Sequence, residues 1–158
     1  MPTARENEQF RKSENVKKWI TYYRGNWDLF AEEVLGIKLY PVQKLKLHMI
    51  GVADEYWDFS SRSTAKSFIV GVAAFCAMSL YPHSEIVVTS SSIPQSARLV
   101  RDKMIKEIIK KYSPYLKYLY EKGYLTVKML DEGVFVLTNT LNESPTTVAV
   151  CSETARGM

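Results

Sequence analysis

The chain has 158 residues, of which 46% are hydrophobic and 24% are charged. This balance excludes an intrinsically disordered chain and allows one domain with a substantial core. The formal net charge of +4 is compatible with a nucleic-acid partner but does not by itself predict one.

The sequence has no segment typical of a membrane-spanning or secreted protein. Its most apolar run, Phe68–Leu80, is shorter than the ~20 residues that a membrane-spanning helix needs. The polar N-terminus lacks the apolar stretch of a signal peptide. Cys76 and Cys151 have no metal-ligand spacing and are expected to be reduced, buried side chains. We therefore expect a cytosolic protein without membrane partners.

Helical signals dominate the first third of the chain. Apolar residues recur at spacings of three and four from Val16 until Gly25, which predicts a first helix. A second helix is predicted over Asn26–Leu35, because Asn26 is a plausible N-cap and a glycine follows. A third is expected to begin at Pro41, which suits the first helical position, and to end near Gly51.

Gln43 lies in the first turn of the third predicted helix. Its amide carries both a hydrogen-bond donor and an acceptor, which is what pairing with an adenine edge requires. A surface glutamine on a helix is the simpler interpretation of this residue alone, and both interpretations stay open.

The segment Ser60–Ser67 is the strongest candidate for a functional site. It follows a short aromatic run, Tyr56–Phe59, which we interpret as a strand, and it precedes the predicted helix over Phe68–Leu80. The order of strand, small-residue loop and helix, with Lys66 and Ser67 at the end of the loop, is that of the phosphate-binding pattern G-x-x-x-x-G-K-[ST]. The spacing matches this pattern.

The match to the phosphate-binding pattern is incomplete, because Ser60 and Ala65 replace its two glycines. In such a loop, backbone N–H groups and the helix N-terminus hold a phosphate. Lys66 would reach the β- and γ-phosphates, and the Ser67 hydroxyl would bind Mg²⁺. The alternative is a serine-rich turn that caps the helix, with Lys66 solvated.

A second strand, loop and helix follow the first. The β-branched run Glu85–Ser90 predicts a buried strand, and a helix is expected from Pro94 to about Tyr112. Both serine-rich loops would then lie at the carboxyl edge of a parallel sheet. The helix carries a basic face that fits either nucleic acid or solvent, formed by Arg98, Arg101, Lys103, Lys106, Lys110 and Lys111.

The last part of the chain predicts mainly strands. A short helix over Tyr115–Lys122 precedes a hairpin, whose strands are Tyr124–Leu130 and Val134–Thr138. Asp131–Gly133 forms its acidic turn, and Thr146–Cys151 reads as a further strand. Strands that alternate with helices indicate an α/β fold.

Four segments, in this order, resemble the ATPase domain of the large terminase subunit of tailed bacteriophages. Tyr40–Gln43 resembles the adenine-reading Q motif of that family, and Ser61–Phe68 resembles its Walker A loop, in which an arginine lies inside the loop and alanine can replace glycine. Ile86–Ser92, followed by Gln95–Ala97, resembles the second strand and helix. Thr147–Gly157 resembles the strand and Ala-Arg-Gly turn that precede Walker B.

The resemblance covers about residues 27–158 and implies a fold. That fold is a P-loop NTPase of the RecA-like (ASCE) type, with a parallel sheet flanked by helices. Residues 1–26 would be an N-terminal helical or flexible segment, and residues 27–158 the front part of the ATPase domain. The implied function is a motor that uses ATP and Mg²⁺ to package double-stranded DNA into a capsid.

The resemblance also implies a role for individual residues. Gln43 would contact adenine, Lys66 the β- and γ-phosphates, and Ser67 the Mg²⁺ ion. Arg62 would lie near the γ-phosphate as a catalytic sensor or a finger acting in cis, and Arg156 would belong to the loop before Walker B. The full set of implied nucleotide-binding residues is Gln43, Ser61, Arg62, Ser63, Thr64, Ala65, Lys66 and Ser67.

The implied partners are double-stranded DNA, a portal protein, the small terminase subunit and further copies of the chain, in the host cytoplasm. The family continues to a Walker B acid pair and a nuclease domain, whereas this sequence stops at Met158, and Asp131–Glu132 lies in a predicted turn instead. We therefore expect an α/β domain that is incomplete at its C-terminus and hydrolyses ATP poorly on its own. The alternatives are a non-catalytic nucleic-acid-binding module with a vestigial loop and a helicase-like P-loop ATPase.

Overall fold

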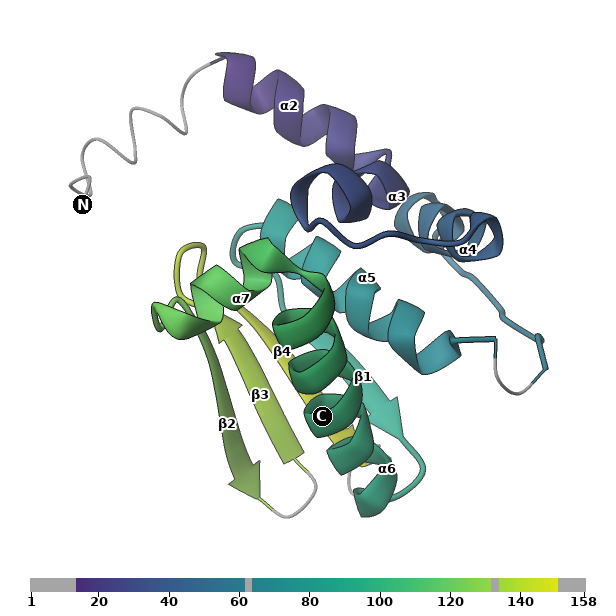
Figure 1. Cartoon of the computed structure of the whole chain (residues 1–158), viewed down its shortest axis with the longest axis vertical. Coiled ribbons are helices and arrows are strands. Elements are labelled where there is room, and N and C mark those ends of the chain that lie inside the picture. Colours follow the sequence, from purple (N-terminus) through teal and green to yellow (C-terminus); the bar gives the residue numbers. More distant parts are fainter. Residues whose placement is uncertain (1–13, 62–63, 132–133, 151–158) are drawn as a thin grey trace.

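The computed structural model describes residues 14–61, 64–131 and 134–150, and its helices gather around one long central helix (Figure 1). The three helices predicted for the first third of the chain are confirmed. The second of them begins as a short α-helix and continues with wider, π-type turns. Their bounds are α2 (Glu14–Arg24), α3 (Trp27–Leu29) with η1 (Phe30–Val34), and α4 (Pro41–Val52).

Gly36 ends the second predicted helix, as expected, for two physical reasons. Its φ of +74° lies in the left-handed region that favours glycine. A Cβ at this position would also lie 3.1 Å from Cδ of Pro114, the first residue of α7. The turn at Gly36 therefore connects η1 to the extended segment that leads into α4.

The central helix is α5 (Lys66–Leu80), and most of its length is buried. It packs against η2 (Leu99–Tyr112), which continues α6 (Ile93–Arg98). The predicted helix from Pro94 to Tyr112 is thus confirmed, and so is the short one after it, α7 (Pro114–Glu121). In the described parts of the chain, no helix is long and apolar enough to cross a membrane.

Within the described residues, the sheet has four strands in the order β1-β4-β3-β2. The predicted hairpin is confirmed as an antiparallel pair, and the predicted last strand is confirmed as the neighbour of its second strand. The described bounds are β1 (Ile86–Ser90), β2 (Leu125–Asp131), β3 (Val134–Asn139) and β4 (Ser144–Val150).

The prediction of a RecA-like parallel sheet is wrong. Only β1 and β4 pair in parallel, whereas β4 pairs with β3, and β3 with β2, in antiparallel orientation. The short turn over residues 140–143 joins β3 to β4 directly. Parallel neighbours need a long crossover, so such a turn can only join antiparallel strands. The described strands therefore form a mixed sheet, which has both parallel and antiparallel pairs, within an α/β fold.

The strand predicted over Tyr56–Phe59 is also absent, because these residues have no strand assignment and pair with no strand of the sheet. Trp57 is 74% exposed and Phe59 is 89% exposed, and their rings stack with centroids 6.3 Å apart. The loop that follows therefore leaves an extended segment rather than the end of a central strand.

The strand predicted over Glu85–Ser90 exists as β1, but it is not buried on both faces. Among the described strands it lies at the edge of the sheet, with β4 as its one neighbour. Its side chains alternate between more and less buried, and Val87 is 62% exposed. This alternation is typical of an edge strand with one solvated face.

We predict that Gly51→Ala destabilises the protein, because α4 approaches α3 closely at this glycine. A Cβ on Gly51 would lie 2.6 Å from the Trp27 ring. Overpacking of this kind costs about 1–3 kcal/mol and outweighs the roughly 1 kcal/mol that alanine gains over glycine in a helix. Urea unfolding followed by circular dichroism should show a lower midpoint for the variant.

The matched control is Gly25→Ala, where the nearest heavy atom to the new Cβ is 3.8 Å away. We expect its unfolding midpoint to stay close to that of the wild type. A Gly51→Ala protein that is more stable than the wild type would show that helix propensity outweighs this contact.

Candidate functional site

A cavity of about 1030 Å³ lies between α4, the start of α5 and η2. Three segments form its walls: Gly36–Tyr40 with Gln43, Thr64–Phe68, and one face of η2. Five of the residues predicted as ligands of a nucleotide therefore line one space, namely Gln43, Thr64, Ala65, Lys66 and Ser67. Its volume is comparable to that of known small-molecule sites.

Of the other predicted ligands of the loop, the structure describes Ser61, which is exposed and does not line this cavity. Arg62 and Ser63 lie outside the described residues, as does Arg156. Their predicted roles stay predictions.

The start of α5 has the geometry of an open helix N-terminus. Ala65 adopts a left-handed conformation, with φ of 58° and ψ of 25°, directly before Lys66. This explains why the phosphate-binding pattern has a glycine here, since a left-handed alanine costs roughly 1–2 kcal/mol. The N-cap residue Ala65 makes no side-chain hydrogen bond to the helix. The alternative of a serine-rich capping turn stays open, because Ser63 lies outside the described residues.

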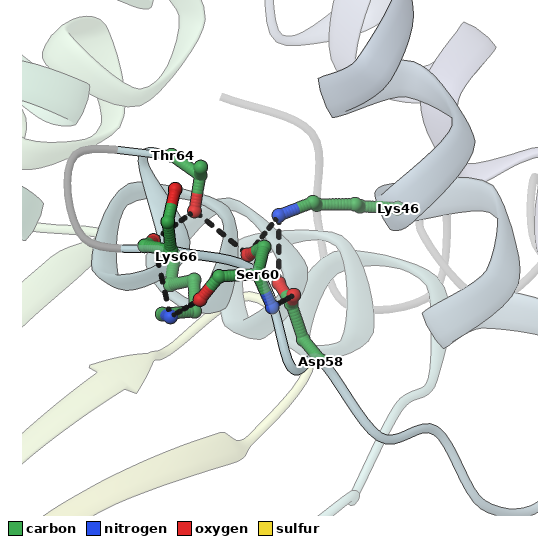
Figure 2. Close-up of polar contacts among 6 residues, drawn as sticks. Lys46, Asp58, Ser60, Thr64 and Lys66 are labelled. Atoms are coloured by element: carbon green, nitrogen blue, oxygen red, sulfur yellow. Dashed lines mark hydrogen bonds and ion pairs between the residues drawn. The ribbon is translucent and has the colours of Figure 1, made fainter.

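Lys66 folds back onto its own loop. Its Nζ donates hydrogen bonds to the carbonyl oxygen of Ser60 and, at 3.3 Å, to that of Ser61 (Figure 2). The side chain is therefore not simply solvated. An incoming phosphate would offer this ammonium group a charged acceptor in place of two neutral carbonyls, and such charge-assisted bonds are the stronger ones.

A buried lysine of α4 reaches the same loop. Lys46 is only 7% exposed, and its Nζ lies 2.8 Å from Oδ2 of Asp58 and 2.7 Å from Oγ of Ser60. The backbone N–H of Ser60 donates to Oδ1 of Asp58 at 2.9 Å. These hydrogen bonds from Lys46 and Ser60 hold the pKa of Asp58 well below its usual range. Figure 2 shows this network beside Lys66.

The side chain of Gln43 already accepts a hydrogen bond at the start of its own helix. Its Oε1 accepts a hydrogen bond from the Tyr40 backbone N–H at 2.9 Å, which caps the start of α4. The amide nitrogen is therefore the group of Gln43 that can donate to a ligand while this cap is intact. Simultaneous use of donor and acceptor on an adenine edge would require the cap to open.

The cavity is rich in positive charge. Four lysines line it, against one carboxylate, Glu107. Glu107 pairs with one of these lysines at 2.6 Å. This excess of positive charge favours an anionic ligand with several charges. The lining lysines are Lys38, Lys66, Lys103 and Lys111.

The helix η2 contributes an aromatic side chain as well. Tyr112 lines the cavity and meets Phe68 edge-to-face at 5.7 Å, while the ammonium group of Lys111 lies 5.0 Å from the Tyr112 ring centre. Sequence reasoning considered the basic face of this helix only as a nucleic-acid or solvent face. The signal that could have assigned it to the site is the apolar face of the same helix, which packs on α5.

Another lysine of the basic face of η2 is paired within the helix. Lys106 pairs with Asp102 at 2.8 Å, one turn away on the exposed surface. Serine side chains of the second serine-rich loop form hydrogen bonds with the start of the following helix. Ser90 Oγ lies 2.5 Å from Ser96 Oγ, and Ser91 Oγ donates to the Gln95 side chain at 2.6 Å. None of these loop serines lines the cavity.

Ser67 fits the role of a Mg²⁺ ligand only together with a phosphate. It is exposed, lines the cavity and offers one hydroxyl oxygen, a ligand type that Mg²⁺ accepts. Over the described ranges, no group of three or more His, Cys, Asp or Glu side chains could hold a metal ion. Phosphate oxygens and water would therefore supply most of the coordination.

A scan against protein-family models, a search of curated proteins and a search of solved structures each returned no match. The site is therefore interpreted from its own geometry.

We predict that Asp58→Asn lowers the melting temperature at neutral pH, because it removes the carboxylate that faces buried Lys46. The folded-state pKa of Asp58 is depressed, so the ionised carboxylate stabilises the fold above its ordinary pKa of about 4. As the pH falls from there towards the lower folded-state pKa, this contribution is lost. The difference in melting temperature between variant and wild type should therefore be largest above pH ~5 and should shrink on acidification.

The control is Asp54→Asn, an exposed carboxylate in the same connecting segment. Thermal unfolding should give this variant the melting temperature of the wild type across the pH range. A difference for Asp58→Asn that is independent of pH would contradict an electrostatic role of the carboxylate.

Proposed function

We propose that this chain binds ATP with Mg²⁺ in the cavity, as the ATP-binding part of a motor that packages double-stranded phage DNA. The observation that carries the proposal is the position of Lys66 and Ser67. Both lie at the N-terminus of α5, in a lysine-rich cavity that also contains Gln43. Helix N-termini favour phosphate through their free N–H groups and their positive dipole end.

The triphosphate would lie at the start of α5. On binding, Lys66 exchanges the carbonyl oxygens of Ser60 and Ser61 for β- and γ-phosphate oxygens. Ser67 supplies its hydroxyl to the bound Mg²⁺. Lys103 and Lys111 on η2 add positive charge on the opposite wall of the cavity. Arg62 keeps the catalytic role near the γ-phosphate that the resemblance implies.

The base would lie towards the start of α4. The Gln43 amide nitrogen donates to the adenine edge, while the Tyr40 N–H keeps the amide oxygen in place. An aromatic side chain lies at this end of the site, because Tyr40, the N-cap residue of α4, lines the cavity. A flat heteroaromatic base is the kind of group that such side chains contact well.

The wider role rests on the ordered resemblance to the large terminase subunit. Under this proposal the chain acts in the host cytoplasm, with double-stranded DNA, a portal protein, the small terminase subunit and further copies of itself as partners. ATP hydrolysis belongs to the assembled motor, where in-line attack of water on the γ-phosphate is coupled to DNA movement. The features that support ATP binding are the loop and the cavity, and not the mixed sheet.

The decisive measurement is the binding of a fluorescent ATP analogue in the presence of Mg²⁺, for the wild type and for Lys66→Ala. We expect saturable binding that weakens at least tenfold in the variant, because the lost ammonium–phosphate bonds exceed about 1.4 kcal/mol. Circular dichroism checks that the variant is folded. Lys106→Ala is the control, since this exposed lysine of η2 does not line the cavity.

A folded wild type that binds no nucleotide would contradict the proposed function. Binding that survives unchanged in Lys66→Ala would place the nucleotide elsewhere.

A further inference from the structure

Lys46 is not part of the phosphate-binding pattern, yet it is the most buried charged side chain near the loop. Only 7% of its surface is exposed. A lysine is rarely buried to this extent unless it is paired. Its two partners, Asp58 and Ser60, both belong to the segment that leads into the loop.

The hydrogen bonds around Lys46 form a chain with one direction. An ammonium group can only donate, so Ser60 Oγ accepts from Lys46 and keeps its own proton for another acceptor. Thr64 Oγ1 lies 2.7 Å from Ser60 Oγ and donates to the Ser61 carbonyl at 2.8 Å. The Ser60 hydroxyl therefore donates to Thr64. The chain connects the first residue of the loop to the residue just before Ala65.

We propose that Lys46 is a positioning residue that holds the loop in its phosphate-binding shape, with and without ligand. The inference rests on the proposed function, and it adds a residue that no sequence motif contains. Gln43 and Lys46 lie one turn apart on α4, so neighbouring positions of one helix would contact the base and hold the phosphate loop.

The chain from Lys46 matters because Lys66 cannot hold the loop once a phosphate is bound. In the structure, Lys66 donates hydrogen bonds to the carbonyls of Ser60 and Ser61. Those bonds break when Lys66 turns to phosphate, whereas the chain through Ser60 and Thr64 does not include Lys66. Lys46 thus keeps the loop ordered in advance, which lowers the entropic cost of binding.

The conformation of Ala65 needs the same support. A left-handed alanine persists only where its surroundings fix the backbone on both sides. Helix α5 fixes the following side. The contacts of Thr64 with Ser60 and Ser61 fix the preceding side, and Lys46 anchors them.

The test measures three ligands on Lys46→Met: Mg²⁺–ATP, tripolyphosphate and adenosine. We expect ATP and tripolyphosphate to bind at least tenfold more weakly, while adenosine, followed by NMR titration, stays within twofold. Lys46→Arg keeps the charge and several donors and should restore most of the phosphate affinity. Lys44→Met is the matched control, because this lysine of α4 pairs with Glu32 and does not line the cavity.

Thr64→Val gives a second, nearly isosteric route, because it breaks the chain without leaving a buried charge unpaired. It should weaken tripolyphosphate binding about threefold to tenfold. If Lys46→Met fails to fold, Thr64→Val tests the positioning role instead. Unchanged tripolyphosphate binding in Lys46→Met, or in Thr64→Val when Lys46→Met is unfolded, would overturn the proposal, as would equal losses for adenosine and tripolyphosphate.

Hydrogen exchange separates this inference from the proposed function. If the wild type binds neither ATP nor tripolyphosphate, the proposed function fails, and the loop amides still report on Lys46. Their exchange over residues 60–66 should quicken at least tenfold in Lys46→Met or Thr64→Val, while the centre of α5 stays protected. Unchanged loop exchange would overturn the positioning role.

Discussion

The burial of α5 determines most of the structure. Apolar side chains cover nearly all of this helix, which packs against η2 on one side and against α4 and the sheet on others. Helices α5 and η2 approach closely at Gly71, where a Cβ would lie 2.7 Å from Cδ1 of Ile108. Because α5 cannot shift within this packing, its N-terminus is held at one place, at the floor of the cavity. The chemical site is thus a consequence of the core.

The helices were predictable because their signals are local. Pro41 at the start of α4 and Gly36 after η1 act through the backbone of their own segment. The order and direction of the strands depend on contacts between distant segments, and motif order is a weak guide to them. Tyr56–Phe59 shows this: its aromatic residues suit a strand, but no strand of the described sheet pairs with it.

The candidate site was predictable in part for the same reason. Lys66 and Ser67 follow from spacing within one loop, and Gln43 from its position in a first helical turn. Sequence analysis missed Lys46 and Asp58, which are twelve residues apart. Their interaction exists only because the fold packs α4 against the segment that leads into the loop. Likewise, η2 enters the cavity wall only through its packing on α5, so its lysines carried no signal specific to this site.

Two side chains of the loop already donate to backbone carbonyls, and this determines how a phosphate would bind. Lys66 donates to the carbonyls of Ser60 and Ser61, and Thr64 donates to that of Ser61. For Lys66, binding therefore exchanges hydrogen bonds, and the free energy of this exchange is the difference between carbonyl and phosphate acceptors. A mononucleotide phosphate gains little from such an exchange, whereas a triphosphate also meets the lysines of η2. The arrangement therefore favours longer polyphosphates over short ones.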